Sequence, residues 1–178
     1  MTEFMQIAFY VAGAVAVVAT ALAITRVAAV HALLYLIVSL LAVAVAFYTM
    51  GAPLVAALEV IIYAGAIVVL FVFVVMMLNL GAQARKTERQ WLVASAWIGP
   101  VILSALLLAE VIFLIVRVPL SGVLGHVTEP KQVAMALYGP YLIGVELASM
   151  LLLGALVGAC HLGRAEPRRT PSGTEVQR

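Results

Sequence analysis

Five long apolar stretches constrain this chain more than any other feature of its sequence. They cover about residues 4–25, 30–50, 54–80, 91–116 and 138–162. Each is long enough to cross a bilayer, which takes about 20 predominantly apolar residues. Of the 178 residues 66% are hydrophobic and only 10% are charged, whereas a soluble domain is about 25% charged. We therefore expect an integral membrane protein.

The apolar stretches favour helices over the strands of an outer-membrane barrel. Barrel strands alternate apolar and polar residues over roughly ten-residue segments, and these stretches do not alternate. The first stretch is too long for a signal peptide, and Glu3 but no Lys or Arg precedes it. We predict an all-α membrane protein with five transmembrane helices in residues 1–163. The polar residues 164–178 are expected to form a disordered cytoplasmic tail.

Lys and Arg are distributed unequally between the two ends of the predicted spans. Eight of the ten would lie on one side of the membrane, and only Arg117 and Lys131 on the other. Cytoplasmic loops are enriched in Lys and Arg, so we predict a periplasmic N-terminus and a cytoplasmic C-terminus. The net charge of +2, with no basic stripe, gives no indication of nucleic-acid binding.

Small residues indicate that the helices pack closely with partners. Ala12, Ala16, Ala19 and Ala23 form a stripe on the first span, and Gly154 and Gly158 form a GxxxG pattern on the fifth. Small residues let helix backbones approach one another in lipid. We therefore expect other membrane subunits and the bilayer itself as the partners of this chain.

Three glutamates fall within the predicted spans: Glu59, Glu110 and Glu146. An ionisable group at the bilayer centre costs about 2.5–3.5 kcal/mol on insertion scales, so each needs a reason. At 1.5 Å per residue, all three lie roughly 9–12 Å inside the outer end of their helices. Glu59 and Glu146 indicate a proton-handling or water-lined zone, or else neutral acids hydrogen-bonded to a neighbouring helix. Glu110 is a weaker candidate, for which the neutral acid is favoured, and its place nearest a helix end also lets it lean outward toward the headgroups.

The residues after Glu59 suggest a special segment at mid-span. Tyr63 lies four residues later, on the same helix face, and Ala64-Gly65-Ala66 follows. Glycine there serves either close packing or a local π-bulge, and the residues alone favour packing. His31, at the start of the second span, is a weaker proton-path candidate and more simply a structural hydrogen-bonding group.

No residue set in the sequence indicates catalysis or metal binding by this chain alone. Cys160 is the single cysteine, so it cannot form an internal disulfide. No Cys/His set has metal-ligand spacing, and no hydrolase triad, phosphate loop or dinucleotide fingerprint is present. We therefore assign no catalytic residue, no metal and no cofactor to the chain.

Four stretches resemble a known family. They read HALLYLIVSLL (31–41), ALEVIIYAGAIVVLFVFVVMMLNL (57–80), WIGP (97–100) and YGPYLIGVELASMLLL (138–153). In these stretches the chain resembles the J subunits of bacterial NADH–quinone oxidoreductase, respiratory complex I, whose mitochondrial counterpart is the mitochondrially encoded subunit six. The resemblance extends through Arg164 but is poor in the outer loop 117–137.

The resemblance implies a membrane-arm subunit of a proton-translocating enzyme in the bacterial inner membrane. That enzyme passes electrons from NADH through FMN and iron–sulfur clusters to quinone, and these groups belong to other subunits, so this chain would meet quinone only indirectly. The resemblance also implies a third helix that switches between bulged and regular forms at Tyr63–Ala66. Glu59 and Glu146 lie within the matching stretches, and Glu110 does not.

Two other functions stay open from the sequence. One is a small proton or cation transporter, or a subunit of a related cation/proton antiporter complex; a stand-alone transporter would remain active when purified by itself. The other is a scaffold that braces neighbouring helices without touching protons. Replacing Glu59 and Glu146 by Gln distinguishes a scaffold from a proton path.

Overall fold

The computed structural model describes residues 2–26, 29–77, 95–117 and 127–164, and these divide into two compact units, residues 1–130 and 131–178. The described residues form helices and no strands, and five helices are long and apolar enough to cross a membrane. The predicted all-helical class and the number of spans are confirmed. The expected tail lies outside the described residues, apart from Arg164.

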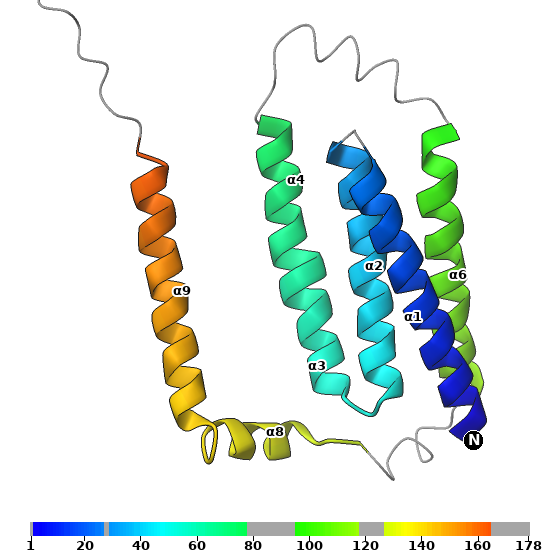
Figure 1. The fold of residues 1–178 in the computed structure, drawn as a ribbon. Coiled ribbons are helices and arrows are strands. Elements are labelled where there is room, and N and C mark those ends of the chain that lie inside the picture. Colours follow the sequence, from blue (N-terminus) through cyan, green and yellow to red (C-terminus); the bar gives the residue numbers. More distant parts are fainter. Residues whose placement is uncertain (1, 27–28, 78–94, 118–126, 165–178) are drawn as a thin grey trace, which may run out of the picture. The chain divides into compact units, whose positions relative to one another are not determined.

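Four spans belong to the first unit (Figure 1). They are α1 (Thr2–Thr25), α2 (Ala29–Thr49), a third span made of α3 (Pro53–Leu58), η1 (Glu59–Ile67) and α4 (Val68–Met77), and α6 (Ser95–Arg117). The turn between α2 and α3 needs glycine, because Gly51 has a φ of 81°. Pro53 then opens α3, at the position where its missing N–H costs least.

The second unit differs from the sequence prediction at its beginning. A helix, α8 (Pro130–Leu137), starts at the boundary between the units, inside the stretch expected to be an outer loop. The fifth span, α9 (Leu142–Leu162), begins at Leu142 rather than at 138. Residues 138–141 form a turn instead, because Gly139 and Pro140 interrupt the helix and proline lacks the N–H that a helix interior requires.

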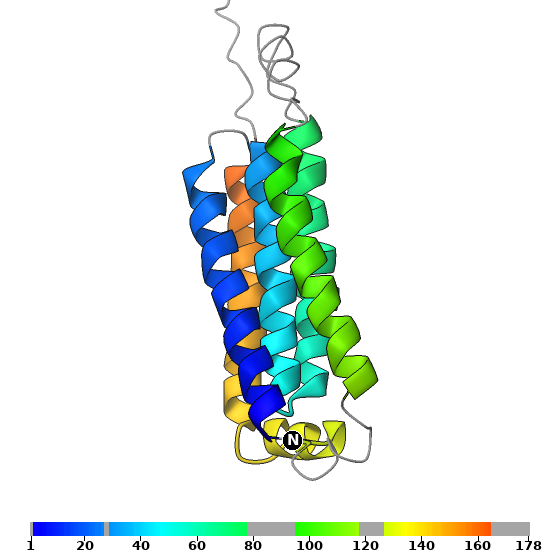
Figure 2. The same ribbon diagram turned by 90° about the vertical axis from the view of Figure 1, so that its right-hand side faces the viewer.

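Helix α2 is the centre of the first unit (Figures 1 and 2). It packs against α1, against all three parts of the third span and against α6, while α6 also packs against α1. Buried side chains on α1, α2 and α6 recur every three or four residues, which is the spacing of one helix face. These positions are Ala8, Ala12, Val15 and Ala19; Tyr35, Val38 and Ala42; and Leu107, Glu110 and Leu114.

Small and polar residues join α1 to α2. Ala12 and Ala19 of the predicted stripe are fully buried, whereas Ala16 and Ala23 are only half-buried. The hydroxyl oxygens of Thr20 and Ser39 lie 2.7 Å apart, and the Ser39 hydroxyl also donates to the Ala16 carbonyl oxygen at 3.1 Å. Such bonds hold helices together in lipid, where apolar burial gives no drive to associate.

A tyrosine–glycine contact joins α2 to α6 near the end where α2 begins. The Tyr35 side chain is 2% exposed, and the Arg26 guanidinium lies 5.2 Å from its ring centroid. A Cβ atom at Gly99 would overlap the Tyr35 hydroxyl and lie 3.0 Å from Tyr35 Cζ. Gly99, in the WIGP stretch, therefore provides the space that the buried tyrosine occupies.

Replacing Gly99 by Ala tests this contact. The added methyl group forces Tyr35 or the α6 backbone to move, and overpacking of this kind costs about 1–3 kcal/mol. We expect Gly99→Ala to lower the melting temperature of the membrane-extracted protein. Gly13→Ala is the control, since nothing within the described chain lies within 4 Å of a Cβ there. If Tyr35→Phe fails to restore any stability to the Gly99→Ala protein, the hydroxyl is not the obstacle.

Candidate functional site

The middle of the third span is wound as a π-helix. The nine residues of η1 lie between the α-helical turns of α3 and α4, and the N–H of Val68 donates to the Tyr63 carbonyl oxygen, five residues back, as well as to that of Gly65. π-Helices are rare, most are a single turn, and many mark functional sites. The expected departure from a regular α-helix around Tyr63–Ala66 is confirmed, and it extends further, from Glu59 to Ile67.

Gly65 serves the winding of this helix rather than contact with another helix of the chain. The one atom within 4 Å of a Cβ at this position, outside the nearest helix backbone, is the Val60 carbonyl oxygen, at 3.1 Å. Ordinary contacts to carbon lie at about 3.5–4.0 Å. The preference for packing that the residues alone gave is therefore wrong within the described chain. Glycine is the residue that leaves this carbonyl oxygen uncrowded.

The polar side chains of η1 are not buried in this chain. No residue of η1 is buried, and among the described side chains of the third span only Ala56 and Val68 are. Glu59 is partly exposed and Tyr63 is 51% exposed. Neither side chain has a hydrogen bond or an ion pair within the part of the chain that the structure describes. The polar groups of η1 are thus free to contact water, lipid or another subunit.

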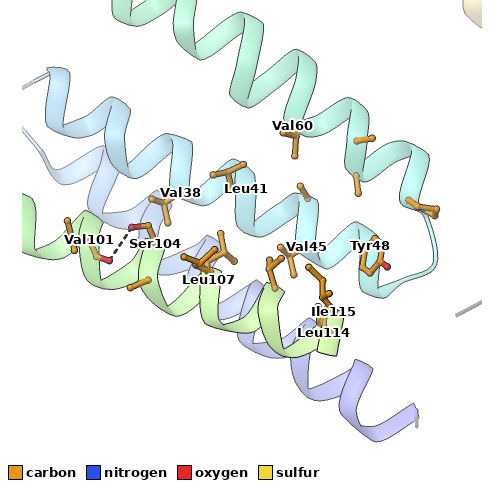
Figure 3. Close-up of a pocket in the computed structure, with 17 residues that line it drawn as sticks. Val38, Leu41, Val45, Tyr48, Val60, Val101, Ser104, Leu107, Leu114 and Ile115 are labelled. Carbon is orange, nitrogen blue, oxygen red and sulfur yellow. Dashed lines mark hydrogen bonds between the residues drawn. The ribbon is translucent and has the colours of Figure 1, made fainter. Parts of the chain in front are cut away.

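An apolar cleft of about 910 Å³ lies between the third span and α6, with α2 as its floor (Figure 3). Val38, Leu41, Val45 and Tyr48 line it from α2, and Val60 points into it from η1. Ser104 of α6 also lines the cleft, but its hydroxyl donates to the Val101 carbonyl oxygen at 3.1 Å. One wall of this cleft therefore includes the π-helix, so a change in its winding would reshape the cleft.

The other two glutamates have contrasting surroundings. Glu110 is 8% exposed, and both carboxyl oxygens are buried without a hydrogen-bond partner in the described residues. The expectation that Glu110 leans outward is wrong, because it shares the buried face of α6 with Leu107 and Leu114. Glu146 is exposed on α9 in the second unit, where the Ser149 hydroxyl donates to its backbone carbonyl oxygen.

His31 and Cys160 complete the residues singled out from the sequence. His31 is 8% exposed in the first turn of α2, and its Nε2 atom has no partner among the described residues. Cys160 is a free, exposed cysteine near the end of α9. No group of three or more His, Cys, Asp or Glu residues that could hold a metal occurs in the described ranges.

Two features of this region were missed in the sequence. Val60 is one of several apolar residues around Glu59, and nothing in the sequence distinguishes it as a wall of the cleft. The burial of Glu110 had a signal, because Leu103, Leu107, Glu110 and Leu114 follow the four-three-four spacing of one helix face. This spacing could be interpreted as burial only once α1 was known to pack on that face of α6.

Comparisons with known proteins identify the family of this chain. Residues 19–162 match the family described as NADH-ubiquinone/plastoquinone oxidoreductase chain 6. NADH-quinone oxidoreductase subunit J of Pseudomonas aeruginosa is 55% identical over 166 residues, which cover 93% of this chain and 100% of the relative. The subunit J of Escherichia coli K12 is 54% identical over 162 residues, covering 91% and 88%. That of Buchnera aphidicola from Schizaphis graminum is 46% identical over 160 residues, covering 90% and 98%.

The family match begins within α1, at residue 19, and covers α2, the third span, α6 and α9 completely. The π-helix and the cleft beside it therefore lie within the matched region. The chain belongs to the NADH-ubiquinone/plastoquinone oxidoreductase chain 6 family, together with the bacterial proteins named NADH-quinone oxidoreductase subunit J.

Proposed function

We propose that this chain is a membrane-arm subunit of a proton-translocating NADH–quinone oxidoreductase, and that η1 couples quinone reduction to proton movement. Its family supports the first part. The observation that carries the second part is a nine-residue π-helix at the middle of a membrane span. NADH, FMN, the iron–sulfur clusters and quinone bind in or near partner subunits. The chain lies in the bacterial inner membrane, with its N-terminus periplasmic and its C-terminus cytoplasmic.

The coupling we propose is a change of winding in the third span. A π-helical turn holds an extra residue, so converting one to α-helix rotates everything beyond it by roughly 100°, one residue's turn. The near end is fixed to α2 by the short turn at Gly51, whose carbonyl oxygen also accepts a hydrogen bond of 2.9 Å from the Thr128 N–H. Because the α3 end of the span is held in place, α4 is the part that rotates.

Rotation of α4 changes which side chains face the neighbouring subunits. Val68, now 1% exposed, would leave its buried position, while Val69 and Phe71, now 61% and 53% exposed, would swing around the axis. Apolar side chains that enter or leave a narrow gap break or form a chain of water molecules. Two windings of similar free energy provide the two-state element that coupling between distant sites requires.

Two polar side chains suited to proton transfer belong to η1 itself. Glu59 is the first residue of η1 and Tyr63 is four residues further on. A carboxyl group can take up and release a proton, and a phenol can donate one hydrogen bond while it accepts another. We assign Glu59, Tyr63 and Gly65 to the gate and its proton path, with Glu146 of α9 as a further proton-carrying group.

Gly65→Val tests the gate. The added side chain crowds the Val60 carbonyl oxygen, which lies 3.1 Å from the Cβ position, so the variant should favour a regular α-helix. We expect an assembled enzyme with several-fold lower proton pumping and lower quinone reduction, and with α4 rotated in its structure. Gly13→Val on α1 is the control, because a Cβ at Gly13 meets nothing within 4 Å in the described chain.

The proposed gate is refuted if the Gly65→Val enzyme pumps protons at the wild-type rate although its third span has become a regular α-helix. The proposal is also refuted if the π-helix keeps the same winding in every catalytic state of the wild-type enzyme. Loss of assembly in Gly65→Ala as well as Gly65→Val would assign the glycine a structural role instead.

Glu59→Gln and Glu146→Gln test the proton path. Glutamine keeps the shape of the side chain but cannot release a proton at physiological pH. We expect several-fold lower NADH-driven proton pumping in inverted membrane vesicles, with normal assembly, and unchanged pumping in the control Glu3→Gln, whose side chain is exposed in the first turn of α1. Wild-type pumping in the Glu59→Gln, Glu146→Gln double variant would favour a scaffold role.

A further inference from the structure

Glu110 is a titratable group that the proposed gate does not use. It lies on α6 between the buried Leu107 and Leu114, and its carboxyl group is close to the backbone of Ala12 on α1, without a hydrogen bond of good geometry. Both of its carboxyl oxygens are buried from solvent. The residue is 92% buried, since 8% of its surface is exposed. A carboxyl group is thus enclosed between two membrane helices with no described partner.

No described charge lies near enough to pair with this carboxyl group. The neighbouring buried positions of α1 are Ala8, Ala12 and Val15, which are apolar. Among the titratable groups of α1, Glu3 is exposed in the first turn and Tyr10 is 64% exposed.

Among the described side chains, the titratable groups of α2 and α6 do not supply a partner either. His31, Tyr35 and the neighbouring Arg26 lie at the end where α2 and α6 begin, and Glu110 is fifteen residues, or roughly 22 Å, along α6 from Ser95. Tyr48 of α2 lines the cleft and has no hydrogen bond to Glu110 in the described residues. Arg117 begins seven residues, roughly 10 Å, beyond Glu110 along α6, and its side chain lies outside the described part of the chain.

A charged carboxylate without a partner is very costly in such surroundings, whereas a neutral carboxylic acid is not. We propose that Glu110 is a proton-binding site, occupied while α1 and α6 are packed together. The ligand is a proton, held on one oxygen of the carboxyl group. This site is independent of the winding of η1, so each proposal can fail without the other.

Infrared spectroscopy of the assembled enzyme at neutral pH tests the site directly. A neutral carboxylic acid has a C=O stretching band that ionised carboxylates lack, and the band shifts in D₂O. We expect Glu110→Gln to remove one such band relative to wild type, and Glu110→Asp to displace it. Glu3→Gln is the matched control, because its carboxyl group is exposed in the first turn of α1 and its replacement should leave the band unchanged.

An unchanged band in assembled Glu110→Gln enzyme overturns the proposal, since Glu110 would then be ionised. Assembly gives a second criterion. A neutral buried acid tolerates replacement by neutral side chains, so Glu110→Gln or Glu110→Leu should assemble to wild-type levels, whereas a buried charge paired with another subunit would lose its partner in both. Failure of both variants to assemble therefore also overturns the proposal, whatever the infrared result.

Discussion

The absence of water in the bilayer core governs this structure, because every backbone N–H and C=O there must find a partner inside the protein. Within a single span, helical winding satisfies that requirement. The third span shows that more than one helical winding can do so, because the N–H of Val68 donates to a carbonyl oxygen five residues back and to another three residues back. The membrane thus restricts the span to a helix but leaves its winding to the local residues, and Gly65 removes the Cβ that would crowd the π-helical carbonyl oxygen.

The rest of the first unit is arranged around α2. Lipid tails are as apolar as leucine, so the helices associate through close contact and hydrogen bonds rather than through hydrophobic burial. Alanines on α1, the Thr20–Ser39 contact and the space left by Gly99 for Tyr35 all shorten the distance between neighbouring helices. The third span also packs against α2, but few of its described side chains are buried, and it is the span whose winding departs from the α-helix.

The small number of buried side chains on the third span explains why the proposed gate lies there. A helix buried on several sides cannot rotate without disturbing many contacts, because packed interiors deform little. Among the described side chains of the third span only Ala56 and Val68 are buried, and an apolar cleft separates the span from α6. The rotation that we propose for the part beyond η1 would therefore displace few buried side chains of the described chain. Its exposed polar residues, Glu59 and Tyr63, remain available to partner subunits.

The sequence by itself determined the number of spans, their approximate limits and the family, because hydropathy over 20 residues and long ordered motifs need no knowledge of the fold. It also identified Ala64-Gly65-Ala66 as unusual, although the residues alone left packing and a π-bulge both open. Helix α8 was missed because eight residues of mixed polarity in a loop give no membrane-span signal.

Only the tertiary structure decided how the glutamates differ. Glu59 and Glu110 have similar predicted depths, yet the first is partly exposed on the third span and the second is enclosed against α1. Burial depends on which helix faces each residue, and short-range sequence patterns do not specify neighbours that are a hundred residues apart in the chain. For the same reason, the space that Tyr35 occupies over Gly99 could be found only once α2 and α6 were seen side by side.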